Sequence, residues 1–191
     1  MQNQYRIACR ILVVFLLIIS TALIVSCSTI PLPDGPNQSL VIIPVRLISS
    51  WVDKNGNVLS LDSITLTIRE MNYETSPEDL RQYKASASSR DLYAAVALPK
   101  GLYLIDSVKV AYHSDRGWDD THTQTVSYQI YVESDSVQLI PQILNLEKND
   151  YHWYSLRFRG YPDADQKEAI LAALKEEQFW PAWSGCQLVR F

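Results

Sequence analysis

The chain has 191 residues, of which 17 are Lys or Arg and 21 are Asp or Glu, so its formal net charge is −4. The basic residues form no cluster, and this excludes a nucleic-acid partner held through phosphate contacts. Two of the three cysteines, Cys9 and Cys27, lie in the first 27 residues, so Cys186 has no cysteine partner within residues 28–191 for a disulfide or a cysteine zinc site. The length suits one domain with a sizeable core.

The first 27 residues have the layout of a secretory signal. Arg6 and Arg10 precede the largely apolar residues 11–25, which are followed by Ser26 and Cys27. A positive start, an apolar centre and a small residue at the cleavage point are typical of secreted proteins. An uncleaved membrane anchor is the alternative, but this apolar stretch is shorter than the roughly 20 residues that a helix needs to cross a bilayer.

The segment Ile24-Val25-Ser26-Cys27 resembles the lipobox of bacterial lipoproteins. The resemblance implies that residues 1–26 are a signal peptide and that the Cys27 thiol receives a diacylglyceryl group. Two or more acyl chains give stable membrane anchoring. By analogy with enteric bacteria, Ser28 favours the outer over the inner membrane. The expected location is therefore the bacterial cell envelope, with the membrane reached through the lipid anchor.

Residues 27–39 are rich in proline and predict a tether. Three prolines and Gly35 resist both helix and sheet, so we expect a partly extended spacer between lipid and domain. The folded domain is then expected over residues 40–191.

The domain reads as β-structure from its start. Residues 64–68 alternate apolar and polar side chains strictly, which predicts a strand with one buried face. Asn55-Gly56 indicates a hairpin turn, and Pro44 suggests an edge position or a bulge in the first strand. Residues 72–90 are polar and give no prediction. Strands are expected at 40–48, 64–68, 91–98, 102–112, 126–132, 137–146 and 151–159.

Turns and loops separate these seven expected strands. Pro99-Lys100-Gly101 predicts a tight turn between paired antiparallel strands, with Gly101 in the left-handed conformation. The polar residues 113–125 predict a loop. Seven short strands with polar turns are typical of an antiparallel sandwich.

The C-terminal part differs from the rest. Asp163 and Asp165 offer an N-cap, and Glu168 follows Asp165 with the spacing of a capping box. Apolar residues continue at helical spacing, so one helix is expected over about 163–178, packed on the sandwich. A last short strand is expected within 187–191.

The segment Leu98-Pro99-Lys100-Gly101-Leu102-Tyr103 resembles a turn of transthyretin-like (prealbumin-like) sandwiches, which also occur as carboxypeptidase regulatory-type domains. The resemblance covers roughly residues 40–160, although Lys100 stands where a second proline or small residue is frequent. It implies a seven-stranded prealbumin-like sandwich that binds or scaffolds rather than catalyses. Fold alone, however, does not assign function.

The polar stretch over residues 113–122 offers candidate metal ligands. His113, Asp115, Asp119 and His122 carry nitrogen and oxygen donors suited to zinc or calcium. Their spacing matches no known metal motif, and a solvated β-hairpin connection needs the same residue types. A metal-dependent hydrolase built on this loop is thus an alternative, while the main expectation is no metal, no cofactor and no catalysis.

Aromatic residues offer the other candidate site. Trp118 and Trp153 are candidates for stacking against a sugar or another ligand, with Tyr128 and Tyr154 nearby in the expected sheets. The alternative is that these rings serve as core and cross-strand partners. The sequence therefore predicts a lipid-anchored, non-catalytic binding or scaffolding module whose partner is an envelope protein or a glycan.

Overall fold

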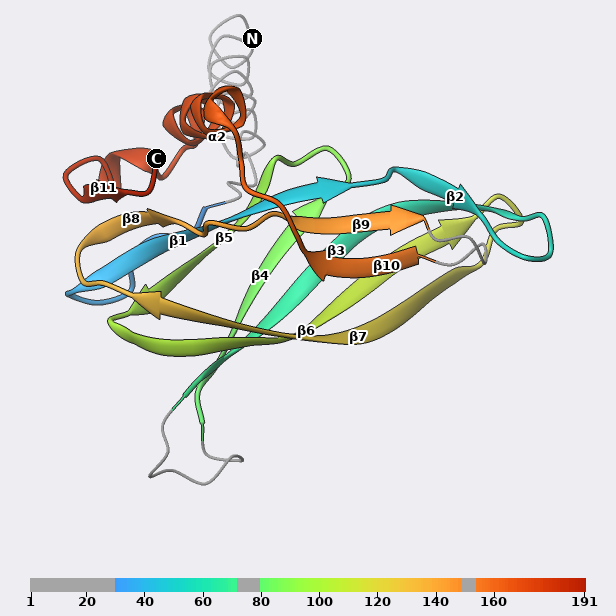
Figure 1. The fold of residues 1–191 in the computed structure, drawn as a ribbon, viewed down its shortest axis with the longest axis horizontal. Coiled ribbons are helices and arrows are strands. Elements are labelled where there is room, and N and C mark those ends of the chain that lie inside the picture. The colour runs from blue at the N-terminus through green and yellow to red at the C-terminus, as the bar shows by residue number, and fades with distance from the viewer. Residues whose placement is uncertain (1–29, 72–79, 149–153) are drawn as a thin grey trace, which may run out of the picture.

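The computed structural model describes residues 30–71, 80–148 and 154–191, and this part of the chain is mainly β. Its strands form two facing sheets, with one α-helix and one 3₁₀ turn near the C-terminus (Figure 1). The elements are β1 (Gln38–Leu47), β2 (Ser50–Val52), β3 (Val58–Glu70), β4 (Gln82–Ser88), β5 (Tyr93–Pro99), β6 (Gly101–Ser114), β7 (Asp119–Val132), β8 (Ser136–Leu139), β9 (Leu144–Lys148), β10 (Tyr154–Phe158), α2 (Ala164–Glu176), η1 (Trp180–Ala182) and β11 (Gln187–Val189).

The two sheets differ in their pairing. The five-stranded sheet is antiparallel, with the order β2-β3-β6-β7 and β4 paired to β3. The six-stranded sheet is centred on β1, which pairs antiparallel with β5 on one side and parallel with β8 and β9 on the other. The predicted β-rich fold with one C-terminal helix is confirmed, whereas the described strands number eleven rather than seven and one sheet is mixed.

Strand β1 is buried on both faces, which explains its unbroken apolar sequence. Val41 and Ile43 point into the core between the sheets. Leu40 and Ile42 point to the other side, where they pack with Ile170 of α2. The helix therefore covers the outer face of the six-stranded sheet (Figure 1). A strand covered on both faces lacks the alternation of a half-exposed strand.

Pro44 lies in a central strand, so the prediction of an edge position is wrong. The amide of Val45 donates to the carbonyl of Leu92 at 3.0 Å, so the ring nitrogen of Pro44 points to the opposite side of β1. On that side β8 pairs as far as Ile42 and β9 pairs from Val45 onward. The missing N–H therefore falls in the gap between two partner strands, where it costs no ladder hydrogen bond.

The turn at Pro99-Lys100-Gly101 connects the two sheets and does not form a hairpin. Strand β5 pairs with β1, while β6 pairs with β3 and β7. The φ angle of Gly101 is also not positive, so the predicted left-handed conformation is wrong. A Cβ there would lie 3.3 Å from the Tyr103 ring, whose hydroxyl donates to the Pro99 carbonyl at 2.9 Å. A side chain at position 101 would therefore need the Tyr103 ring to shift by a few tenths of an ångström.

The structure differs in detail from three further predictions. The predicted loop over 113–125 is largely strand, because β6 and β7 extend as a polar hairpin beyond the core. The predicted strand over 137–146 is divided into β8 and β9. Within 72–90, residues 82–88 form β4, and residues 72–79 lie outside the described part of the chain.

The expected C-terminal helix is confirmed as α2, but its cap differs. The Asp163 carboxylate accepts from the Gln166 amide at 2.8 Å, and the Gln166 side chain accepts from the Asp163 amide at 3.3 Å. The capping box is therefore built on Asp163 rather than on Asp165 and Glu168. The short strand β11 follows, as predicted for the chain end.

The segment before β1 is packed more closely than a free tether. Residues 31–37 form neither helix nor strand, as its prolines predict. Ile30, however, is 1% exposed and belongs to the apolar cluster between β1 and α2. The indole Nε1 of Trp183 donates to the Pro31 carbonyl at 2.8 Å. Within the described residues, contacts with the domain therefore extend back to Ile30, ten residues before the predicted start.

Candidate functional site

Two of the predicted site residues, Cys27 and Trp153, lie outside the described residues. Within the described residues, no helix has the length and apolar character needed to traverse a bilayer. The lipid attachment at Cys27 therefore stays a prediction from the sequence.

The candidate metal ligands lie on opposite faces of the β6–β7 hairpin. On β6, Tyr112 is buried and points inward, so the neighbouring His113 points outward. There Nδ1 of His113 lies 2.7 Å from Oδ1 of Asp62. Asp119 is directly opposite His113 and shares this outward face, because cross-strand partners point to the same side.

His122 points to the inward face instead. It lies opposite the buried Val110, and its ring packs edge-on against Tyr154 at 5.9 Å. Asp115 lies in the exposed turn, where its side chain accepts from the Ser114 hydroxyl at 3.2 Å. Among the described residues, no three His, Cys, Asp or Glu side chains come together in a way that could hold a metal. The geometry that the hydrolase alternative requires is therefore not formed by His113 and His122.

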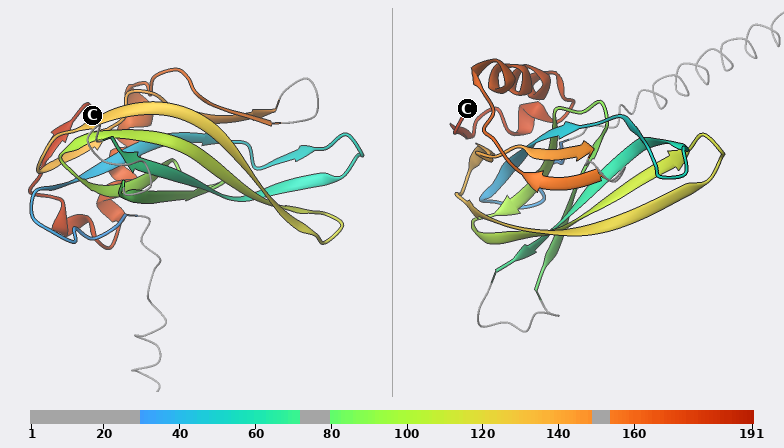
Figure 2. Two further views of the ribbon diagram at one scale, coloured as in Figure 1. Left: turned by 90° about the horizontal axis from the view of Figure 1, so that it is seen from below. Right: turned by 45° about the vertical axis from the view of Figure 1, so that its right-hand side comes forward.

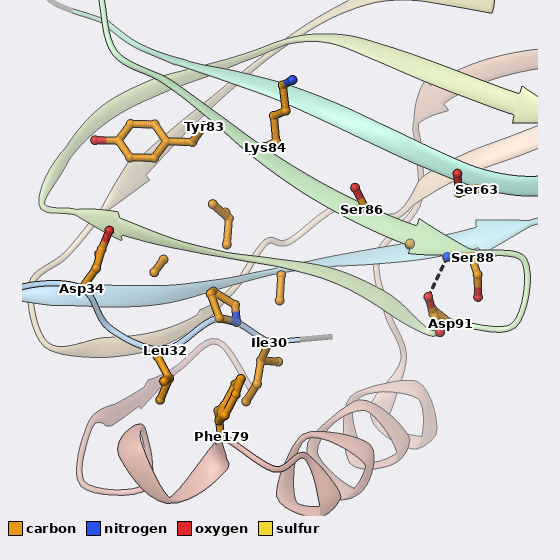
Figure 3. Close-up of a pocket in the computed structure, with 15 residues that line it drawn as sticks. Ile30, Leu32, Asp34, Ser63, Tyr83, Lys84, Ser86, Ser88, Asp91 and Phe179 are labelled. Carbon is orange, nitrogen blue, oxygen red and sulfur yellow. Dashed lines mark hydrogen bonds between the residues drawn. The ribbon is translucent and has the colours of Figure 1, made fainter. Parts of the chain in front are cut away.

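A groove beside β4 and β5 has a volume of about 630 Å³ (Figure 3). This size falls in the range of about 300–1,000 Å³ that is usual for ligand pockets. In Figure 3, β5 and the segment before β1 form the lower side of the groove, and β4 forms its upper side. It is lined by Ile30, Pro31, Leu32, Asp34, Ser63, Tyr83, Lys84, Ser86, Ala87, Ser88, Asp91, Ala95, Val96, Ala97 and Phe179. We call this cavity the β4–β5 groove.

The β4–β5 groove lies where an edge of each sheet is open. Strand β4 pairs only with β3 and β5 pairs only with β1, so in the described chain neither uses its second edge. A short turn joins the two strands, and in it the Ser88 amide donates to the Asp91 carboxylate at 2.6 Å (Figure 3). Since no ladder joins them, the groove separates two strand edges that belong to different sheets.

Side chains from both faces of β4 line the β4–β5 groove. Lys84 and Ser86 come from its exposed outward face, where the Ser86 hydroxyl lies 3.2 Å from that of Thr65. Ala87 and Tyr83 come from the opposite face. On β5, the consecutive residues 95–97 line the groove. A cavity that touches alternate faces of a strand lies along its edge, so it reaches the unpaired backbone groups there.

The opposite wall of the β4–β5 groove is apolar and held in place. Phe179 and the buried Ile30 belong to the cluster under α2. The hydrogen bond from Trp183 to Pro31 fixes the segment before β1 beside them. Leu32, which is 52% exposed, extends this wall. The groove therefore offers backbone polar groups along the strand edges and apolar side chains opposite.

The sequence did not indicate the β4–β5 groove. Its β4 side falls in residues 72–90, where polar composition gave no prediction. Whether a strand lies at an edge depends on its partners, which no local pattern specifies. The small residues of β4 and β5 were the one available signal, because such side chains let another backbone approach a strand closely.

The structure brings Trp118 and Tyr154, two of the aromatic residues considered from the sequence, to one pocket. Trp118 is 39% exposed, and its ring packs edge-on against Tyr112 with centroids 6.2 Å apart. Tyr128 instead stacks on Phe158 at 4.1 Å, as a core partner.

The chain matches no protein-family model, no curated protein and no solved structure. A functional assignment therefore depends on the residues and their geometry.

Proposed function

We propose that the protein is a lipid-anchored, non-catalytic binding module of the bacterial cell envelope that captures an extended peptide segment in the β4–β5 groove. The observation that carries this proposal is the pair of unpaired strand edges that border one cavity. Cys27 supplies the membrane anchor, with the outer membrane favoured by Ser28. The transthyretin-like resemblance adds the expectation of a binding or scaffolding role.

An extended peptide matches both parts of the β4–β5 groove. Its backbone can pair with an open edge, as in β-strand addition, where main-chain hydrogen bonds give affinity and pockets for alternate side chains give specificity. Strand β4 has seven residues, so at about 3.3 Å per residue it offers an edge of roughly 23 Å. A segment of about seven residues could therefore pair along its length.

The walls of the β4–β5 groove indicate the composition of that segment. Side chains that point toward Leu32 and Phe179 meet apolar surface, while Lys84, Asp34 and Asp91 stand among the polar lining residues. The charges are mixed, so the groove has no strong preference for the sign of the peptide. The best partner is an envelope-protein segment that alternates small or apolar side chains with polar ones.

Replacing Ala97 with lysine tests this assignment. Ala97 is half-buried on β5 and lines the groove, so a long charged side chain there fills the space that a bound strand needs. We expect at least a tenfold loss of affinity for peptides selected on the unaltered full chain from a display library of linear peptides. Thr125→Lys adds the same side chain at an exposed position of β7 outside the groove and is expected to bind normally.

Amide hydrogen exchange supplies a second measurement on the unaltered protein. Bound peptide should slow exchange at β4 or β5 and leave the β6–β7 hairpin unchanged. The proposal fails if the library yields no binding peptide, or if selected peptides bind Ala97→Lys as well as the unaltered chain.

A further inference from the structure

The β2–β3 and β6–β7 turns project at the end of the sandwich opposite the helix (Figure 2). A second cavity lies beside these turns. It has a volume of about 180 Å³, and residues from the β2–β3 turn, the β6–β7 hairpin and β10 converge on it. It is lined by Trp51, Asp53, Lys54, Asn55, Leu59, Tyr112, Trp118, Asp120 and Tyr154. We call it the aromatic pocket; it shares no residue with the β4–β5 groove.

Four aromatic rings form the framework of the aromatic pocket. Trp51 packs edge-on against Tyr112 and Tyr154, with centroid separations of 5.3 Å and 5.1 Å. Trp51 and Tyr112 are 4% and 8% exposed, so they form a fixed floor. Trp118 packs against Tyr112 and stays 39% exposed, which places it at the rim. An exposed indole beside a buried aromatic floor is available to cover a flat ligand.

Fixed polar groups accompany these rings. Asp120 accepts from the Tyr112 hydroxyl at 3.3 Å and from the Thr121 amide at 2.7 Å, which orients its carboxylate. Asp53 accepts from the backbone amides of Asn55 and Asn57 at 2.8 Å and 2.9 Å. Desolvation raises the pKa of Asp53, but these hydrogen bonds outweigh it and hold the pKa below its usual value. The Asp53 carboxylate thus remains an acceptor.

The Tyr154 hydroxyl is the polar group of the aromatic pocket whose surroundings indicate a ligand. Within the described residues, its oxygen is buried and has no hydrogen-bond partner. Desolvation and the neighbouring Tyr112 and Asp120 raise its pKa above the usual value, so it stays a protonated donor. A buried donor without an acceptor is costly, and a small shift of the Tyr154 side chain toward a ligand oxygen in the pocket would relieve that cost.

We infer that the aromatic pocket binds a single neutral sugar ring, such as one unit of an envelope glycan. Its volume is below the range of about 300–1,000 Å³ for drug-sized ligands, so it suits one ring. A sugar presents apolar C–H faces to aromatic rings and hydroxyls that both donate and accept. The polar lining matches this, because it combines two carboxylates and the Asn55 amide with donors on Lys54 and Tyr154.

An organic cation is the other ligand class that aromatic pockets take. Here Lys54 lines the pocket and Arg116 lies close enough to lower the pKa of Asp53. These two positive charges offset the negative charges of the Asp53 and Asp120 carboxylates, so the pocket has no excess negative charge to attract an organic cation. A neutral sugar is therefore the better match. Its proposed site shares no residue with the proposed peptide site.

The test uses the full chain in detergent and methyl glycosides of glucose, galactose, mannose and N-acetylglucosamine as probes. We expect at least one glycoside to bind, with saturation-transfer NMR strongest at protons on one face of its ring. Trp118→Ala should lower that affinity at least tenfold, while Trp118→Phe should retain it within about threefold. Tyr131→Ala removes a 48% exposed aromatic side chain outside the pocket and should have no effect.

The NMR measurement on the unaltered chain decides the outcome even if Trp118→Ala fails to fold. The inference is overturned if no glycoside binds, if Trp118→Ala and Tyr131→Ala behave alike, or if tetramethylammonium binds and displaces the glycoside. Ala97→Lys should leave glycoside binding unchanged, so failure of the peptide site and failure of the sugar site are distinguishable.

Discussion

Replacing Trp183 with alanine is expected to lower the free energy of unfolding by about 3–5 kcal/mol, the usual cost of truncating a buried large aromatic residue. Trp183 is 1% exposed and packs in the cluster between β1 and α2. It also donates from Nε1 to the Pro31 carbonyl at 2.8 Å. The substitution would therefore leave a cavity under the helix and release the segment that forms one wall of the β4–β5 groove.

Urea unfolding followed by circular dichroism measures this effect, and Trp183→Phe is the matched control. Phenylalanine retains an aromatic ring and loses the indole hydrogen bond, which contributes about 0.5–1.5 kcal/mol, so the control should lose much less stability than the alanine variant. Unfolding of Trp183→Ala at the same urea concentration as the unaltered chain would contradict the role of this residue. Because the groove wall depends on Pro31, peptide affinity should fall in the alanine variant as well.

Replacing Cys27 with serine is expected to move the protein from the membrane fraction to the soluble fraction of cells. The proposed diacylglyceryl group needs a sulfur atom, and each buried methylene contributes about 0.8 kcal/mol to membrane binding. Without the acyl chains, the domain keeps no anchor of comparable strength in the proposed scheme. Cell fractionation and intact-mass measurement of the purified protein report on this change.

Cys186→Ser is the matched control for that experiment. Cys186 is a half-buried residue packed beside the cluster under α2, and it belongs to the folded domain. Its substitution should leave membrane association and the added mass of the lipid unchanged. An unmodified Cys27 thiol in the natural protein would refute the anchored module, and the peptide and sugar sites would then have to be tested on an unanchored domain.

Local patterns predicted the elements better than their pairing. Ile64, Leu66 and Ile68 alternate with polar residues, and all three are fully buried in β3. The edge position predicted from Pro44 was wrong because the cost of its missing N–H depends on which strands pair with each side of β1. The hairpin predicted at residues 99–101 was wrong for the same reason, because a tight turn can join two paired strands or two strands of different sheets.

The candidate sites were predictable only in part. Trp118 was identified as a possible ligand-binding residue, and it lies at the rim of the aromatic pocket. Trp51 and Tyr112 were not identified, because a single aromatic residue in a strand does not show which hairpin it will face. His113 and His122 seemed close in sequence, yet strand alternation and register separate them onto opposite faces. Long-range pairing therefore determined which residues came together.

The buried position of Ile30 limits how far the domain can move from a lipid attached to Cys27. Only Ser28 and Thr29 separate these residues, and a fully extended chain spans at most about 3.6 Å per residue, so the two Cα atoms stay within roughly 11 Å. If Cys27 is acylated, the domain would thus stay beside the bilayer surface. The β4–β5 groove, which Ile30 borders, would then lie close to the lipid as well.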